Sequence, residues 1–133
     1  MDPDRPDQRP RTDAQWLGDA AEQDVADRLI AAGWTIVGRN VHVGRYELDI
    51  VAVDPGPPRQ LVVVEVRWRA DRGFGLPEET VDHRKRARLH RAGFELRDRG
   101  SLPDGRAVPG SQLRFDLLVL EPEHKLRHYR HGA

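Results

Sequence analysis

Two acidic residues lie in neighbouring segments that alternate like β-strands, and their spacing predicts that the two carboxylates meet. The segments are 46–53 and 61–68, and the intervening 54–59, rich in proline and glycine, is a turn by composition. A hairpin that closes symmetrically about this turn places Asp49 opposite Glu65. The full set of expected pairs is Val53 with Leu61, Val51 with Val63, Asp49 with Glu65, and Glu47 with Arg67.

This pairing predicts a divalent-metal site. Directly opposed residues of an antiparallel pair share a face, with Cβ atoms about 4.5–5.5 Å apart. Two like charges placed so are destabilising unless a cation lies between them. Mg²⁺ suits such a site, with Mn²⁺ as its substitute, because it is a hard ion that binds one or two carboxylates together with water and phosphate. Asp49 and Glu65 are therefore the expected metal ligands.

Two further residues complete the expected chemistry, which is metal-assisted hydrolysis of a phosphodiester. Arg67 emerges on the same face as Glu65 and can hold a scissile phosphate and stabilise developing charge. Glu22, on the first expected helix, can add a third carboxylate to the metal directly or through water, or it can be a surface glutamate. The metal would lower the pKa of a bound water and offset charge in the transition state.

The elements that must position these residues form a mixed α/β fold. The sequence predicts a helix over 13–32 that ends at Gly33, and strands over 34–41, 46–53 and 61–68. A second helix over 77–99 and strands over 113–120 and 126–129 follow. The segment 61–68 is apolar on both faces, which predicts a central strand in a mixed sheet flanked by helices.

The second expected helix carries a lysine in the middle of its apolar face. That face is formed by Val81, Leu89, Ala92 and Leu96, and Lys85 falls among them at helical spacing. A buried lysine without a partner is costly, so Lys85 either extends outward to solvent or points at an acidic site.

Basic and aromatic residues near the expected site have two interpretations each. His83 and His90 lie in a run of arginines that is either a solvated face or a surface that contacts phosphates. Trp68 and Phe74 are either core-edge residues or platforms on which a base stacks.

Composition limits the function classes. The chain has 133 residues, 33% of them charged, and a formal net charge of zero, which predicts one domain over 13–133 after a disordered tail over 1–12. Residues 13–65 carry nine acidic and four basic residues, whereas 66–99 carry ten basic and six acidic ones. This split suits a metal-plus-phosphate site, or two helices with solvated faces.

Cysteine is absent, which excludes disulfides and cysteine-based zinc sites. Without a long apolar run or a signal peptide, the expectation is a cytoplasmic protein with no membrane partner.

Several of these runs together resemble a known family. They are Ala21-Glu22, Arg39-Asn40, 46–52, 63–67, Gly73-Phe74-Gly75, Lys85, and Arg114-Phe115-Asp116. In this order they resemble the YraN-like uncharacterised bacterial family of the restriction-endonuclease-like PD-(D/E)XK superfamily, near archaeal Holliday-junction resolvases. The resemblance implies an αβββαβ core and a Mg²⁺-dependent nuclease-type site with Asp49, Glu65 and Glu22 as its acids.

Two residues depart from the family pattern. Tyr46 stands where the family usually has glycine, and Arg67 stands where the motif has lysine. Arginine can clamp phosphate but cannot give up a proton. Lys85 is the candidate that supplies the missing ammonium group.

Three functions compete at this point. The first is a metal-dependent nuclease that acts on DNA, including branched or structured DNA, for which a homodimer would suit the cutting of two strands. The second is a nucleic-acid-binding module of the same fold with a weakened or inactive site. The third is a protein-interaction domain whose acids are solvated charges.

Overall fold

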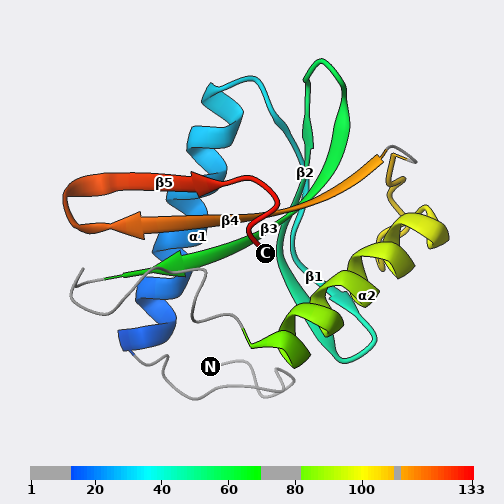
Figure 1. The fold of residues 1–133 in the computed structure, drawn as a ribbon, viewed down its shortest axis with the longest axis horizontal. Helices are drawn as coiled ribbons and strands as arrows, with labels where there is room; N and C mark the ends of the chain where they lie inside the picture. The colour runs from blue at the N-terminus through cyan, green and yellow to red at the C-terminus, as the bar shows by residue number, and fades with distance from the viewer. Residues whose placement is uncertain (1–12, 70–81, 110–111) are drawn as a thin grey trace, which may run out of the picture.

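A five-stranded sheet separates two helices in this computed structural model, which describes residues 13–69, 82–109 and 112–133 (Figure 1). The elements are, in chain order, α1 (Asp13–Ala31), β1 (Thr35–Val43), β2 (Tyr46–Asp54), β3 (Gln60–Trp68), α2 (His83–Arg99), β4 (Gln112–Glu121), the short 3₁₀ helix η2 (Pro122–His124) and β5 (Lys125–Tyr129). Neither α-helix in the described part of the chain has the length and apolarity needed to cross a membrane.

The sheet is mixed, as expected. Its strand order is β1-β2-β3-β4-β5, and every neighbouring pair is antiparallel except β3 and β4, which run parallel. A parallel pair needs a crossover connection, and α2 lies on the connection between these two strands. The prediction that 61–68 forms the central strand is confirmed.

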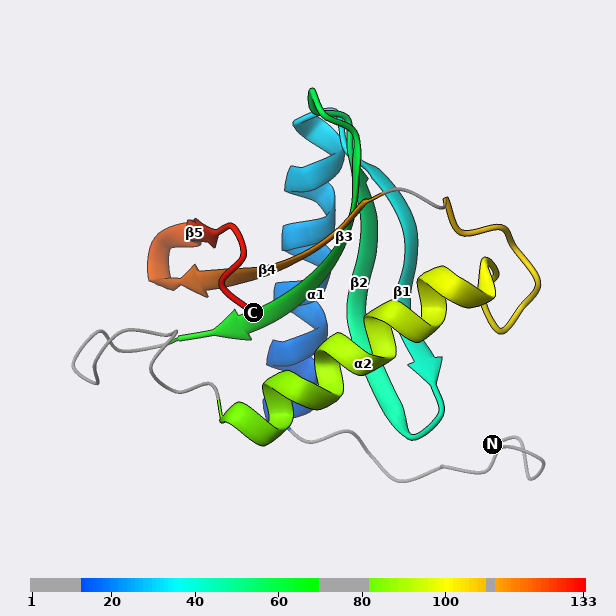
Figure 2. The same ribbon diagram turned by 45° about the vertical axis from the view of Figure 1, so that its right-hand side comes forward.

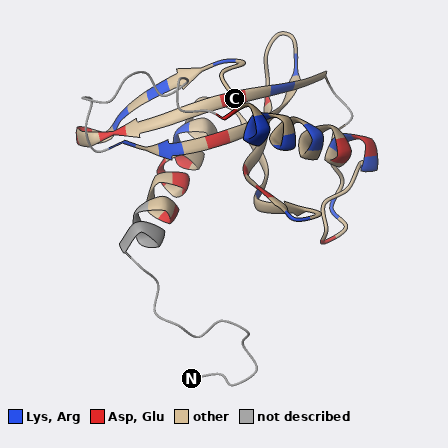
Figure 3. Cartoon of the chain, turned by 60° about the horizontal axis from the view of Figure 1, so that its bottom comes forward, with Lys and Arg blue, Asp and Glu red and all other residues tan. Residues whose placement is uncertain are grey.

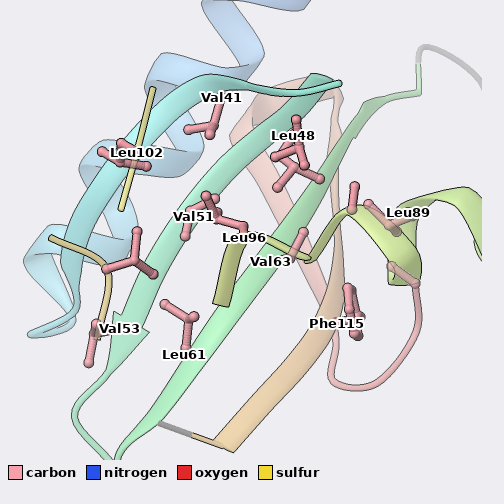
Figure 4. Packing of buried hydrophobic residues seen from close by; sticks show 14 of the residues in the cluster. Val41, Leu48, Val51, Val53, Leu61, Val63, Leu89, Leu96, Leu102 and Phe115 are labelled. Carbon is pink, nitrogen blue, oxygen red and sulfur yellow. The ribbon is translucent and has the colours of Figure 1, made fainter. Parts of the chain in front are cut away.

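Two apolar cores form, one on each face of the sheet. Figure 2 shows α1 and α2 on opposite sides of the strands. Between the sheet and α2, Leu89 and Leu96 pack with Val51 and Val63 in one cluster (Figure 4). Between the sheet and α1, a second cluster includes Val25, Leu29, Ile50, Val62 and Val64. The residues of β3 alternate between the clusters, so this strand is buried on both faces.

The second helix begins later than the sequence pattern predicted. Asp82 has extended backbone angles (φ −66°, ψ 134°), and its carboxylate accepts a hydrogen bond from the Arg84 amide at 3.0 Å. Asp82 is thus the N-cap and the helix starts at His83. The expected first turn at 77–81 lies outside the described residues, as do the expected tail 1–12 and Phe74. Gly100 ends the helix in the left-handed region (φ 73°), as expected.

Gly93 of α2 is required by a close approach of the helix to the sheet, and we expect Gly93→Ala to destabilise the protein by about 1–3 kcal/mol. An added Cβ would lie 2.6 Å from Cε1 of Phe115 and 3.3 Å from Cγ2 of Val63. The Phe115 ring cannot easily move, because it stacks on His90 at 4.1 Å between ring centroids. Chemical denaturation of the two proteins measures the difference.

Gly18 of α1 is the matched control. An added Cβ there meets no atom within 4 Å, so Gly18→Ala should stabilise the protein by about 0.5–1 kcal/mol through helix propensity alone. Equal effects of the two substitutions would contradict the packing argument.

Candidate functional site

Strand β2 changes face at Asp49. Leu48 belongs to the cluster on the α2 side and Ile50 to the cluster on the α1 side, although residues two apart in a strand normally share a face. At the same level of β1, Asn40 has a left-handed backbone (φ 50°), a conformation for which asparagine is enriched. The alternation of side chains along β2 is thus interrupted at Asp49.

The Asp49 carboxylate lies between β2 and β3. These strands pair from Asp54–Gln60 to Ile50–Val64, so the register expected through Val51–Val63 is confirmed. The expected pairing of Asp49 with Glu65 and of Glu47 with Arg67 is wrong, because the paired stretch ends before them. Instead, the Asp49 Oδ2 atom accepts a hydrogen bond from the Val66 amide at 2.9 Å, in the place of a backbone partner.

Asp49 nevertheless interacts with two other carboxylates at this point. Burial first, and then the negative charges of Glu65 and Glu22, raise the pKa of Asp49 to about 7. The Val66 amide and the Lys85 ammonium act in the opposite direction. Strongly perturbed pKa values are concentrated at functional sites, so this group of acids is a candidate site.

Glu22 reaches this cluster from α1. Burial raises its pKa, Arg39 lowers it, and its side chain shares a hydrogen bond with Asp49. The Arg39 guanidinium lies 3.7 Å from Glu22 Oε2. Asn40 adds a second restraint, because its amide, in the orientation that satisfies both partners, donates to Glu22 at 3.1 Å and to Glu47 at 2.9 Å. Glu22 is therefore held at the site rather than extended into solvent.

Lys85 points at the acidic cluster. Its Nζ atom lies 3.4 Å from Oε1 of Glu65, whose side chain is only 12% exposed. The lysine side chain itself is 49% exposed, and of the two expected alternatives the structure shows the one in which Lys85 points at an acidic residue. The buried residues of α2 are Leu89, Ala92, Gly93 and Leu96, which leaves the first two turns of the helix over the edge of the core.

Tyr46 connects the acidic cluster to a groove on the α2 side of the sheet. Burial and the charges of Glu65 and Asp49 raise the pKa of Tyr46 to about 12, while Arg67 and Arg88 lower it. The phenol therefore lies in the field of both the acids and the arginines. The groove, with a volume of about 450 Å³, has Tyr46 on its wall.

Metal binding at this site would use few protein ligands. No group of three or more His, Asp or Glu side chains is arranged to hold a metal ion within residues 13–69, 82–109 and 112–133. Asp49 and Glu65 offer hard oxygen donors, which is the chemistry that Mg²⁺ selects, and Mg²⁺ commonly takes the rest of its coordination from water and phosphate. These two carboxylates therefore fit Mg²⁺ or Mn²⁺, provided that water and phosphate complete the coordination of the ion.

Two residues that were given an alternative role near the site lie elsewhere. His90 is a packing residue, because its Nε2 atom lies 2.8 Å from the Ala133 carbonyl oxygen and its ring stacks on Phe115. Trp68 is 39% exposed and lines a separate hollow with Leu120 and His124. His83 is exposed at the start of α2, among the basic residues that mark this helix in Figure 3.

A buried ionic network that joins β4 to the end of β2 and to β5 was missed by the sequence analysis. Arg114 makes two hydrogen bonds of 2.9 Å to Asp116 and one of 2.9 Å to Asp54. His128 lies 2.7 Å from the same Asp116 carboxylate. Two charged residues spaced two apart in an otherwise apolar strand were the available signal, because such residues share one buried face. The network stabilises the fold and lies apart from the acidic cluster.

The family model and the similar proteins all point to one family. The model of the uncharacterised protein family UPF0102 matches residues 21–120. A UPF0102 protein of Symbiobacterium thermophilum is 39% identical over 107 residues, which cover 80% of this chain and 82% of that protein. One from Bifidobacterium longum is 35% identical over 120 residues, or 88% and 91% of the two chains. The solved structure of SfsA of Pyrococcus furiosus in complex with Ca²⁺ has a TM-score of 0.37 and 16% identity, covering 89% of this chain and 64% of that one.

Proposed function

This chain belongs to the uncharacterised protein family UPF0102, and we propose that it is a metal-dependent nuclease that hydrolyses phosphodiester bonds in DNA, including branched or structured DNA. The observation that carries the proposal is the convergence of Glu22, Asp49 and Glu65. Burial, together with the charges of Glu65 and Glu22, raises the pKa of Asp49 to about 7, and a bound divalent cation would offset the repulsion between the ionised carboxylates.

In this proposal Asp49 and Glu65 bind Mg²⁺ or Mn²⁺ directly. Glu22 contributes through water, since the described residues contain no group of three direct ligands. When bound, the metal would activate a water molecule and offset negative charge on the phosphate under attack. The hydrogen bond from the Val66 amide fixes the orientation of Asp49, so that one carboxylate oxygen stays available for the metal.

Basic side chains have separate roles in the same proposal. Lys85, held 3.4 Å from Glu65, places an ammonium group next to the expected scissile phosphate. There it stabilises the charge that develops in the transition state, in place of the motif lysine. Arg67 clamps a phosphate oxygen, which its planar guanidinium does without proton transfer. Arg39 and Asn40 hold Glu22 and are positioning residues.

A nucleic-acid-binding module without turnover is the second candidate. The arginine at position 67 favours it, because a guanidinium stays protonated at neutral pH and cannot act as a general base. Such a module would keep the basic α2 surface and lose the need for metal.

An assay on linear, nicked and four-way-junction DNA tests the proposal, with Mg²⁺ and Mn²⁺ in parallel. We expect metal-dependent cleavage that falls by about a thousandfold in the Asp49→Asn/Glu65→Gln double variant. Salt-sensitive DNA binding without cleavage would replace the nuclease with the binding module. Absence of both cleavage and binding would leave a protein-interaction domain.

The two lysines of the chain provide a matched test of the Lys85 role. We expect Lys85→Ala to lower the rate of cleavage about a hundredfold, because it removes a preorganised cation beside the reacting phosphate. Lys125 forms only an exposed ion pair with Glu123 at 3.9 Å, so Lys125→Ala should leave the rate unchanged. If Lys85→Ala cleaves normally while Arg67→Ala is inactive, the assigned roles of the two cations are wrong.

A further inference from the structure

The groove beside Tyr46 has one wall from the β1–β2 hairpin and one from α2, and most of its charged residues are positive. Gly44, Arg45 and Tyr46 come from the turn between β1 and β2 and the start of β2, and Arg88, Arg91 and Glu95 come from α2. We call it the arginine groove. The groove is lined by three guanidinium groups and one carboxylate, so its positive charge favours an anionic ligand.

The floor of the arginine groove is apolar. It is formed by Val43 and Ala92, whose side chains are 3% and 4% exposed and belong to the core on the α2 side. A ligand that fills this space must therefore present an apolar surface downward and negative charge toward the rim. The volume of about 450 Å³ lies in the range of pockets that take small molecules or single residues of a polymer.

We propose that the arginine groove receives one unpaired nucleotide of the DNA strand, next to the phosphate that is cleaved, so that the enzyme selects single-stranded or branched DNA over continuous duplex. An unpaired nucleotide has both required surfaces, because its base is a flat apolar body and its phosphate is anionic. In a continuous duplex the bases are paired and stacked inside, so only the phosphates would reach the rim.

The position of Tyr46 ties the arginine groove to the acidic cluster. Its side chain lines the groove, and its phenol experiences the charges of Glu65, Asp49, Arg67 and Arg88. A strand that passes from the groove to the acids must therefore pass Tyr46. An aromatic ring at this place can stack on the base that enters the groove. The inference rests on the proposed function for the identity of the ligand.

Binding without metal tests the inference separately from cleavage. A fluorescein-labelled oligothymidylate of about twelve nucleotides and a hairpin duplex with the same number of phosphates are titrated in EDTA and followed by anisotropy. We expect wild type to bind the single strand at least about tenfold more tightly than the duplex.

Exposed arginines supply variants that leave the fold intact. Arg88→Ala and Arg91→Ala should each weaken single-strand binding about tenfold and lower the salt dependence by about 0.7 per contact. Arg59→Ala is the control of equal charge, because Arg59 is exposed in the turn at the far end of β2 and β3. Tyr46→Phe should bind like wild type and Tyr46→Leu more weakly if the ring stacks on a base.

Two outcomes would overturn the inference while leaving the nuclease proposal in place. One is equal affinity for single strand and duplex, and the other is an equal effect of Arg59→Ala and Arg91→Ala. Conversely, selective single-strand binding by a protein that cleaves no DNA in Mg²⁺ or Mn²⁺ would support the arginine groove and overturn the nuclease proposal.

Discussion

Replacing Asp49 with asparagine is expected to make the metal-free protein more stable and to remove its response to divalent metal. Burial and the charges of Glu65 and Glu22 raise the pKa of Asp49 to about 7, so folding at pH 8 costs the free energy of keeping this carboxyl ionised. The amide carries no charge and can still accept the Val66 hydrogen bond. We expect Asp49→Asn to recover about 2 kcal/mol at pH 8.

The raised pKa of Asp49 also determines how the stability of wild type changes with pH. At low pH the carboxyl is protonated in both states and costs nothing. As pH rises from about 4, where Asp49 ionises in the unfolded chain, to about 7, where it ionises in the folded protein, wild type loses stability. Asp49→Asn should lack this loss, so the two proteins converge at low pH in thermal melts.

Metal and a surface control complete the experiment. Wild type should gain thermal stability in Mg²⁺ or Mn²⁺, because a ligand that binds only the folded state stabilises it, and Asp49→Asn should not. Asp27→Asn removes a charge from the exposed side of α1 and should change neither the metal-free stability nor the metal response. A less stable Asp49→Asn protein, or one that still responds to metal, would refute the site.

The contrast between Asp49 and its neighbours shows how far the sequence determines this site. The hairpin register was predictable, because it is fixed locally by the turn between β2 and β3 and by the apolar residues of the two strands, among which Val51 pairs with Val63. The end of the pairing at Ile50–Val64 was not. It depends on β1, where Asn40 takes a left-handed conformation at the level of Asp49, and no pattern within β2 and β3 reports it.

The surroundings of Lys85 and Glu22, which lie on the two helices, could not be predicted from the sequence either. Helical spacing placed Lys85 on the apolar stripe, but the buried residues of α2 begin only at Leu89, so its first turns lie beyond the core, where the Lys85 side chain meets Glu65. Spacing alone also left Glu22 undecided between surface and site. Its partners Arg39 and Asn40 come from β1, so only the packing of α1 on the sheet identifies its role.

Removing Arg114 is expected to cause a large loss of stability. Its side chain is 3% exposed and is the cationic partner of Asp116 and Asp54, whose side chains are 0% and 8% exposed. Arg114→Met leaves these buried carboxylates without that cation, which should cost about 3–5 kcal/mol in chemical denaturation. Arg106→Ala, which breaks an exposed pair with Asp104 at 2.8 Å, should cause no measurable change.

A double variant separates the ion pair from simple packing. The Arg114→Met/Asp116→Leu protein buries neither charge of this ion pair, so it should be more stable than Arg114→Met alone. If Arg114→Met were destabilising only through a packing defect, the second substitution would lower the stability further.

The stability of wild type in acid provides an independent check. Despite burial, hydrogen bonds from His128 and Arg114 hold the pKa of Asp116 at about 2, below its usual 3.8. Wild type should therefore lose about 2 kcal/mol as pH falls from about 4 to about 2, a loss that the double variant should not show.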